Sequence, residues 1–428
     1  MAIKIEAARG NFTNCGGLII FDRLMNDLKI KNLMKEFLPG SYKKVVGKNY
    51  DKIRHLIFGF ICGADCLDDM EKLSEDPGFS ALCGKNMVTP AAYSFFLQSF
   101  KPWQIRRMND VLLNTSIKMR KKRFADDREF ILDVDSTGHK QYGKQMEGYQ
   151  WSDYRKFSGL DSLQAYDQYG FQYWMDVRPG ATYTANGAAE AIERIFAKVP
   201  KNFDRKFRGD SGYCQSDVFN ACANQNVSFV VKMPANMRNP ILSTVRNWRK
   251  SKVHFRDGRK AQIGSTLYRA AKNPRETLRM VVIRTTKKNV TMYEKDRYDY
   301  QAWLTNFPES EMKHEEIIEF YRKRGNAENM IRELKNGYDI HHFPCKSLLA
   351  NRAYGVIAAL AYTLMRLQAW NIDGEVPRFS KLIRFRMVFV AGHVVKRGRD
   401  TIIRISKHKH KEVCDWLKQL KMLQYGYG

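Results

Sequence analysis

The stretch EFILDVDST, residues 129–137, is where the chain changes from helical to β texture, and the fold prediction starts from it. Its apolar residues predict a short strand over residues 130–135 that ends in an acid, Asp135. Asp133 lies on the same face of that strand, because side chains alternate with a period of two. We assign the functional role to Asp135, which is nearer the predicted strand end where an open metal site fits, and a structural role to Asp133.

The chain after this strand alternates between predicted strands and helices. A turn, DQYG at residues 167–170, joins the second and third strands. The predicted segments are strands at 162–165 and 171–177, a helix at 186–199, a strand at 203–210, a helix at 215–225, a strand at 227–233 and a long helix at 314–336. This β-β-β-α-β-α-β order predicts an α/β fold of the RNase H-like type, a mixed sheet with helices on its faces.

Helical patterns precede the first strand. Apolar residues recur at helical spacing within residues 20–120. Thr89-Pro90 suits the start of one helix, because proline fits the first turn. A basic run at residues 118–123 ends this part of the chain and fits either a DNA-facing surface or a solvated linker.

A long insertion separates the last predicted strand from the helix at 314–336. Residues 234–300 are strongly basic, and the patches at 279–284 and 290–293 have β-rich composition. They predict an inserted β-rich subdomain. The tail, residues 346–428, begins with a helical pattern and carries 16 Lys and Arg against 5 Asp and Glu.

The charge of the chain indicates a polyanionic partner. Lys and Arg outnumber Asp and Glu by 73 to 45, a net charge of +28, and neutralised phosphates release counterions on binding. The 44% of hydrophobic residues suffice for folded cores, which excludes a disordered basic tail. A membrane surface is the other polyanion, but no apolar run of membrane-spanning length is evident.

The start of the chain and its cysteines indicate a cytoplasmic protein. Residues 1–9 are polar and charged, without the apolar core of a signal peptide. Eight cysteines are scattered without a repeated CxxC pair, so we expect reduced thiols. Cys62 and Cys66, with Cys83 downstream, lack an evident fourth ligand for zinc.

Three acids fall where this fold would bring side chains together. Asp135 ends the first predicted strand, Asp210 ends the fourth within RGDSG, and Glu328 lies on the helix after the fifth. Carboxylates are the hard oxygen ligands that Mg²⁺ and Mn²⁺ prefer. Two such ions a few ångströms apart can activate the attacking oxygen and stabilise the leaving one in phosphodiester displacement. The three acids therefore predict a metal-dependent site for that chemistry.

The predicted helix at 314–336 carries a stripe of polar side chains. Within YRKRGNAENMIRELK, residues 321–335, four residues stand at offsets 0, 3, 7 and 14. At 100° per residue they fall within about 60° of the helix surface. They are Tyr321, Arg324, Glu328 and Lys335. One edge of the helix thus offers a carboxylate flanked by two cations and a phenol.

The spacing Tyr-x₂-Arg-x₃-Glu-x₆-Lys resembles the motif of insertion-sequence transposases of the DDE type, the Tyr-Arg-Glu-Lys group. Asp135-Ser136-Thr137 is similar to the Asp-x-Thr element of that family, and residues 208–213 to its second-acid motif. The β-rich insertion is also similar. The resemblance covers about residues 126–370, whereas the helical N-terminal part matches only in general character.

The resemblance implies DNA cleavage at the terminal inverted repeats of an insertion sequence and strand transfer into target DNA. It implies catalytic and metal-binding roles for Asp135, Asp210 and Glu328, with two Mg²⁺ ions for which Mn²⁺ can substitute. It implies DNA contacts for Tyr321, Arg324 and Lys335. Some relatives excise through a DNA hairpin and hold a flipped base against a tryptophan of the insertion. Trp248 and Trp303 are the candidates, and Trp303 lies in a predicted strand typical of core.

The resulting domain hypothesis has five parts and a double-stranded DNA partner. The parts are a helical DNA-binding region at 1–125, the first part of the RNase H-like core at 126–235, the insertion at 236–300, the core helix with the third acid at 301–345, and a basic helical region at 346–428. We expect a homodimer in the synaptic complex, no membrane association, and a bacterial cytoplasmic location on the nucleoid when DNA is bound.

Two other functions stay open at the level of sequence. One is a DNA-binding regulator derived from a transposase that has lost catalysis, which the loss of an acid would mark. The other is an RNase H-fold nuclease that cuts DNA without joining it. The retained acids argue against the first, and Arg324, Lys335 and the insertion against the second.

Overall fold

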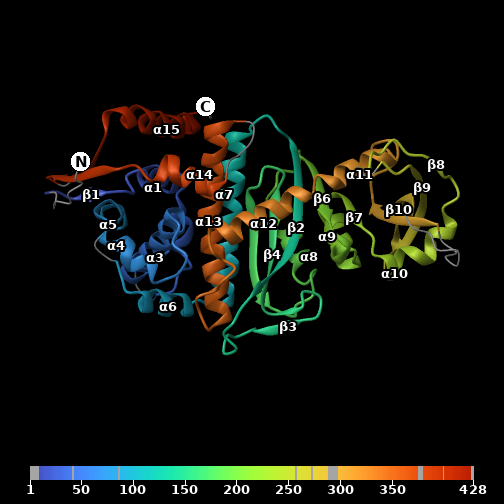
Figure 1. The fold of residues 1–428 in the computed structure, drawn as a ribbon, viewed down its shortest axis with the longest axis horizontal. Helices are drawn as coiled ribbons and strands as arrows, with labels where there is room; N and C mark the ends of the chain where they lie inside the picture. The colour runs from blue at the N-terminus through green and yellow to red at the C-terminus, as the bar shows by residue number, and fades with distance from the viewer. Residues whose placement is uncertain are drawn as a thin grey trace, which may run out of the picture.

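The computed structural model describes residues 9–40, 43–84, 87–255, 258–270, 273–287, 297–374, 379–398 and 400–425. Two long helices, α7 (Pro102–Arg123) and α13 (Leu348–Asp373), pack side by side through the middle of the molecule. The other N-terminal helices lie on one side of this pair and the main sheet lies on the other (Figure 1). Both long helices pack against strand β5 (Gln172–Pro179) of that sheet.

The central strands of the sheet run in the order β5-β4-β2-β6-β7. β4 is antiparallel to β2 and to β5, whereas β6 and β7 are parallel to β2. Their bounds are β2 Glu129–Lys140, β4 Phe157–Asp167, β6 Asp204–Gly209 and β7 Ser228–Lys232. Helices α8 (Ala188–Phe196) and α9 (Ser216–Asn224) connect β5 to β6 and β6 to β7. This arrangement confirms the predicted RNase H-like core.

The first two strands are longer than predicted, since β4 spans Phe157–Asp167 and not 162–165, and β2 also extends further. β2 does not end at Asp135 but continues to Lys140, because its pairing with β4 runs unbroken from Leu132 to Lys140. On its other side β2 loses its neighbour before Asp135, since the pairing of β2 with β6 stops at Asp133. Asp135 therefore lies at the end of the parallel pairing and not at the end of the strand.

The single long helix predicted at 314–336 is also wrong, because the segment forms two helices. α11 (His314–Arg322) and α12 (Gly325–Gly337) are separated by a tight turn at Lys323 and Arg324. Within the turn the backbone makes i→i−3 hydrogen bonds, from Arg324 N to Tyr321 O (2.9 Å) and from Ala327 N to Arg324 O (2.9 Å). Such bonds tighten the helix and change the direction of the side chains that follow.

The insertion extends the main sheet. Beyond β7 the order is β11-β10-β9-β8, with bounds β11 Tyr298–Thr305, β10 Asn273–Thr286, β9 Ala261–Ala270 and β8 Arg249–Lys250. β10 includes the predicted β patch at 279–284, whereas the patch at 290–293 lies outside the described residues. These strands share a separate small core with α11, in which Trp303 and Ile317 are buried. A short helix, α10 (Ala235–Arg238), leads from β7 into the insertion.

The N-terminal part is helical, as predicted. Its elements are β1 (Phe12–Thr13), α1 (Leu18–Asp27), α2 (Ile30–Met34), α3 (Lys43–Cys62), α4 (Asp69–Glu75), α5 (Pro77–Cys83), α6 (Pro90–Gln98) and α7. Thr89 caps α6, as expected from Thr89-Pro90. The three cysteines considered for zinc differ in environment, because Cys62 and Cys83 are buried and Cys66 is exposed.

The chain does contain an apolar run of membrane-spanning length, which corrects the expectation from sequence. Within Leu348–Ile372 of α13, an 18-residue window has a mean hydropathy of 1.3, and 83% of that window is buried inside the protein. α13 packs against β5, α7, α3 and α6. In this structure the run therefore forms a core helix.

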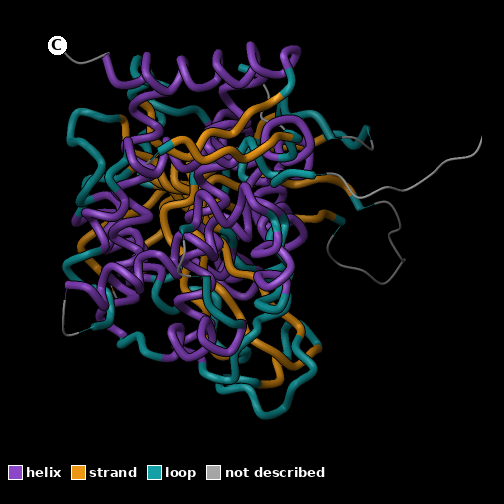
Figure 2. Tube along the Cα trace, turned by 90° about the vertical axis from the view of Figure 1, so that its left-hand side faces the viewer, coloured by secondary structure: helices purple, strands orange, loops and turns teal. Residues whose placement is uncertain are grey.

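The tail after α13 returns to the N-terminal helices. It comprises α14 (Ser380–Ile383), a π-helical turn (Arg384–Val388), the hairpin of β12 (Gly392–Arg397) and β13 (Asp400–Ile405), and α15 (Lys407–Tyr425). β12 pairs with β1, so residues from both ends of the chain form one small sheet. α15 lies across the outside of the molecule (Figure 2) and packs against α1. The sequence predicted a helical start and a basic helical region over 346–428, and the hairpin of β12 and β13 was not predicted.

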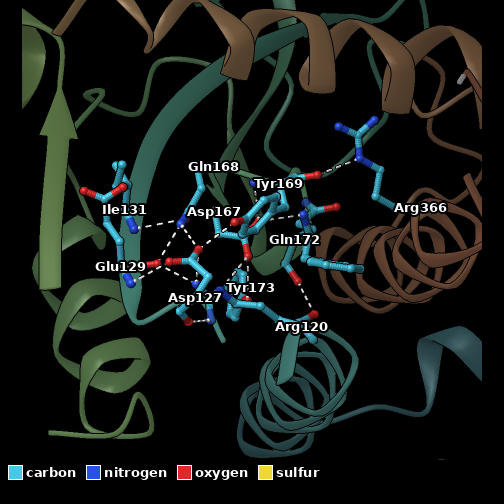
Figure 3. Close-up of polar contacts among 12 residues, drawn as sticks. Arg120, Asp127, Glu129, Ile131, Asp167, Gln168, Tyr169, Gln172, Tyr173 and Arg366 are labelled. Atoms are coloured by element: carbon cyan, nitrogen blue, oxygen red, sulfur yellow. Dashed lines mark hydrogen bonds and ion pairs between the residues drawn. The ribbon is translucent and has the colours of Figure 1, made fainter. Parts of the chain in front are cut away.

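A buried polar network fixes the turn between β4 and β5 to the two long helices (Figure 3). Arg120 of α7 is 2% exposed, lies 3.6 Å from the Asp167 carboxylate and 3.0 Å from that of Asp127. From α13, Arg366 donates to the carbonyl of Tyr169 at 2.9 Å. Burial raises the pKa of Asp167 to about 6, and the charge of Arg120 opposes that rise. Arg120 thus compensates a fully buried carboxylate.

Replacing Arg120 with Met is expected to lower the free energy of unfolding by about 3 kcal/mol or more, because Asp167 is left as an uncompensated buried charge. The matched control is Arg106→Met on the same helix, whose side chain is 64% exposed and lies 3.9 Å from Glu190. We expect that control to change the stability by about 0.5 kcal/mol or less. Urea unfolding of both variants measures the difference, and equal losses would contradict the assignment.

Candidate active site

The register of the parallel strands brings the first two acids together. Asp133 of β2 pairs with Arg208 of β6, so the residues two positions further along, Asp135 and Asp210, leave the two strands side by side. Arg208 donates to both oxygens of Asp133, at 2.7 and 2.6 Å. It also donates to the carbonyl of Phe320 at 2.9 Å, which fixes α11 to the same place. Asp133 is therefore held in a buried ion pair with Arg208, an arrangement that fits the structural role expected for it.

Both acids are held by the backbone and point the same way. Asp135 Oδ1 accepts a hydrogen bond from Ser136 N, and Asp210 Oδ1 accepts one from Gly212 N, each at 2.8 Å. The two remaining oxygens face one nitrogen, Arg324 Nη2, at 3.0 Å from Asp135 Oδ2 and 3.7 Å from Asp210 Oδ2. Two fixed carboxylates therefore converge on a single position that holds positive charge.

Glu328, the third acid, acts on Asp135 electrostatically. Burial, together with the negative charges of Asp210 and Glu328, raises the pKa of Asp135 to about 6, while the charge of Arg324 opposes the rise. Glu328 lies in the first turn of α12 and is exposed. The structure thus brings Asp135 and Asp210 together, with Glu328 in electrostatic reach of Asp135.

The donor set fits a divalent cation. The oxygens of Asp135 and Asp210 already meet at a cationic nitrogen, and carboxylate oxygens are the ligands that Mg²⁺ and Mn²⁺ prefer. Arg324 Nε and Nη2 are buried and have no hydrogen-bond partner among the described residues. The guanidinium of Arg324 is therefore attracted to the acids by charge, but these two nitrogens make no hydrogen bond to them. Asp135, Asp210 and Glu328 are the residues that could hold metal.

The turn between α11 and α12 decides where Arg324 lies. The predicted stripe assumed one continuous helix, but Arg324 lies in the tight turn and is 6% exposed, directed at the acids. Burial raises the pKa of Tyr321, at the end of α11, to about 12, and the charges of Asp210 and Asp135 add to the rise, while that of Arg324 opposes it. The structure therefore brings Arg324 to the acid site, whereas the ring of Tyr321 packs against Trp303, with the centres 5.7 Å apart.

Lys335 lies further along α12 in a different environment. Its Nζ donates to the carbonyl of Gly138 at 2.6 Å, and burial lowers its pKa to about 8, with the charge of Arg155 adding to the effect. Arg155 donates to Ser136 Oγ at 3.0 Å and to the Asp161 carboxylate at 2.8 Å. Arg155 was not predicted from the sequence: it contacts Ser136, the neighbour of Asp135, from the loop after β3 (Gln150–Ser152) and belongs to none of the motifs above.

The two tryptophans considered for base stacking differ in exposure. Trp303 lies in β11 and is 2% exposed, as expected for a core residue. Trp248 is half-buried at the surface of the insertion, and the guanidinium of Arg284 lies 4.1 Å from the centre of its ring. Of the two, only Trp248 offers a partly accessible ring.

Comparison with known proteins places this geometry in a wider context. A family model described as "Transposase DDE domain group 1" matches residues 1–424. No curated protein matches the chain. Among solved structures, the chain is similar to a cryo-EM structure of the piggyBac transposase synaptic complex with hairpin DNA, at 13% sequence identity and a TM-score of 0.43, over 87% of this chain and 79% of that chain. The family match includes the helical N-terminal part and the tail as well as the sheet.

Proposed function

The chain belongs to the transposase DDE domain group 1 family, and from this premise we propose that it cuts DNA at the terminal inverted repeats of an insertion sequence and joins the ends to target DNA. The observation that carries the proposal is the convergence of Asp135 and Asp210 on one cation position, with Glu328 in electrostatic reach. An RNase H-like sheet supplies the fixed strands on which that geometry depends.

We propose that Asp135, Asp210 and Glu328 hold two Mg²⁺ ions, with Mn²⁺ able to replace them. When bound, the ions supply activation of the attacking oxygen and stabilisation of the leaving oxygen. The protein itself fixes the carboxylates through Ser136 N and Gly212 N. Pre-set ligands of this kind keep their orientation without a cost at the time of reaction.

The cations and the phenol around the acids are proposed to hold DNA. Arg324 has a planar fork that matches a phosphate, and its hydrogen-bonding nitrogens are not satisfied by the acids. Tyr321 lies in electrostatic reach of the same acids. We assign a DNA contact to Lys335 as well, on the α12 face that passes Gly138. Together these residues would position the phosphates next to the scissile bond.

The same proposed function implies a DNA-recognition region, an oligomeric state and a cellular location. We propose that residues 1–125 recognise the terminal repeat, that two copies form the synaptic complex, and that the protein acts in the bacterial cytoplasm on nucleoid DNA. A catalytically inactive regulator is the weaker alternative, because all three acids are retained and two of them are pre-oriented. A nuclease without strand transfer differs only in the fate of the cut end.

The test uses the purified chain, DNA carrying a terminal repeat, a target plasmid, and Mg²⁺. We expect cleavage at the repeat end and products in which the 3′ end is joined to the plasmid, and no reaction in EDTA. Cleavage without joined products would support the nuclease alternative. Specific binding without cleavage in any divalent metal would support the regulator.

DNA binding by the whole chain is expected to weaken steeply with salt. The net charge of +28 implies many phosphate contacts, and a protein with 6–10 of them loses roughly 10³- to 10⁵-fold in affinity between 50 and 200 mM salt. Fluorescence anisotropy with repeat and random DNA measures both slopes. We expect similar slopes and a constant preference for the repeat. A flat salt dependence would contradict the proposed phosphate surface.

A further inference from the structure

A second cluster of metal-ligating side chains lies just beyond the C-terminal end of α12. Asp339, His341 and His342 each place a ligand atom within 4.8 Å of the other two. His341 Nδ1 is 2.9 Å from Asp339 Oδ1, and His342 Nδ1 is 3.9 Å from Asp339 Oδ2. The two imidazole rings are 4.2 Å apart. One carboxylate therefore faces both imidazoles.

The backbone after α12 builds this arrangement. Asp339 has a left-handed φ of 47°, a conformation that Asp adopts more readily than most residues. His342 N donates to the Asp339 carbonyl at 3.2 Å and closes the turn. The carbonyl of Lys335, in the last turn of α12, lies 3.0 Å from His341 Nδ1. Carbonyls at a helix C-terminus carry partial negative charge, which favours a cation at this place.

Acids from a second part of the chain add to this charge. Burial raises the pKa of Asp339, and the charges of Asp65, in the loop between α3 and α4, and of Asp69, the first residue of α4, add to the rise, while those of His341 and His342 oppose it. The negative charges that act on Asp339 favour a bound cation at this site.

We propose that Asp339, His341 and His342 bind one transition-metal ion of the Zn²⁺, Co²⁺ or Ni²⁺ class, separate from the site of the three catalytic acids. Two imidazoles and one carboxylate suit such an ion, whereas Mg²⁺ prefers oxygen ligands alone. Asp65 and Asp69 supply surrounding negative charge. The ion would fix the loop that joins α12, the helix of Glu328, to α13. The proposal does not depend on transposase activity.

The test uses untagged full-length protein in which Asp135→Asn, Asp210→Asn and Glu328→Gln remove the other site. Zn²⁺ competition against a chromophoric chelator gives affinity and stoichiometry, and Co²⁺ absorption reports imidazole ligation. We expect one ion per chain. Adding His341→Ala and His342→Ala should weaken binding on the order of 100-fold, the upper end of what loss of a ligand-orienting partner costs.

The matched control carries His408→Ala and His410→Ala in α15, outside the cluster, and should retain the ion. Retained affinity in the His341/His342 variant, or an equal loss in the α15 control, overturns the proposal. Circular dichroism verifies folding, and Asp339→Asn, which keeps both imidazoles, should bind the ion more weakly if the His variant is unstable. Because every protein here lacks the catalytic acids, these outcomes are independent of the cleavage assay.

Discussion

Asp135→Asn and Asp210→Asn are each expected to abolish strand cleavage while leaving DNA binding intact. An amide keeps the size of the carboxylate, and its oxygen can still accept the hydrogen bond from Ser136 N or Gly212 N. It removes the negative charge at the point where the two side chains converge. We expect a single-turnover rate at least ~10³-fold lower, the upper range for loss of one preorganised electrostatic contact. Glu328→Gln should behave in the same way.

Matched controls separate this effect from a general loss of charge. Asp204 begins the strand that Asp210 follows, and its side chain is 54% exposed, so Asp204→Asn should cut DNA at close to the wild-type rate. Glu319 is exposed on α11, so Glu319→Gln is the corresponding control for Glu328→Gln. Single-turnover cleavage in Mg²⁺ and anisotropy at equilibrium give the two readouts. Wild-type cleavage by a folded single variant would remove that residue from the site.

The core sheet could be predicted because its signals are local. The apolar run before Asp135, the turn at residues 167–170 and the alternation of later strands and helices depend on neighbouring residues. The end of β2 depends instead on a distant partner. Ser136-Thr137-Gly138 has weak strand character, and pairing with β4 keeps it extended. A non-local hydrogen-bonded partner cannot be read from those three residues.

The site was predictable in its acids and less so in its cations. The register that puts Asp135 beside Asp210 follows from parallel neighbours of an RNase H-like sheet, so the acids could be placed from the fold. The position of Arg324 could not be predicted in this way. The predicted stripe assumed a constant rotation per residue along one helix, and that assumption does not allow for the tight turn before Gly325. Arg155 reaches the site from a loop, where side-chain direction has no sequence period.

Arg324→Lys is expected to cut DNA slowly even when metal and DNA are saturating. Lysine keeps the charge but loses the planar fork that can contact a phosphate and the acids from one rigid group. A misplaced phosphate harms an oriented reaction more than binding, and a shift of 1 Å can cost ~10²-fold in rate. The control is Arg322→Lys, two residues earlier, whose exposed side chain donates to the His254 carbonyl away from the acids. It should cut at close to the wild-type rate.

Metal titration distinguishes the two roles that the structure allows for Arg324. Its Nη2 lies between the carboxylates of Asp135 and Asp210, where it competes with any bound cation. Arg324→Gln removes this competitor and leaves two like charges to repel each other, so we expect Mn²⁺ to bind the variant more tightly while cleavage stays slow. Tighter metal binding with slow cleavage means that Arg324 positions the phosphate. A defect that disappears at high metal would instead mean that Arg324 serves only to hold the acids in place, and a wild-type rate would exclude both roles.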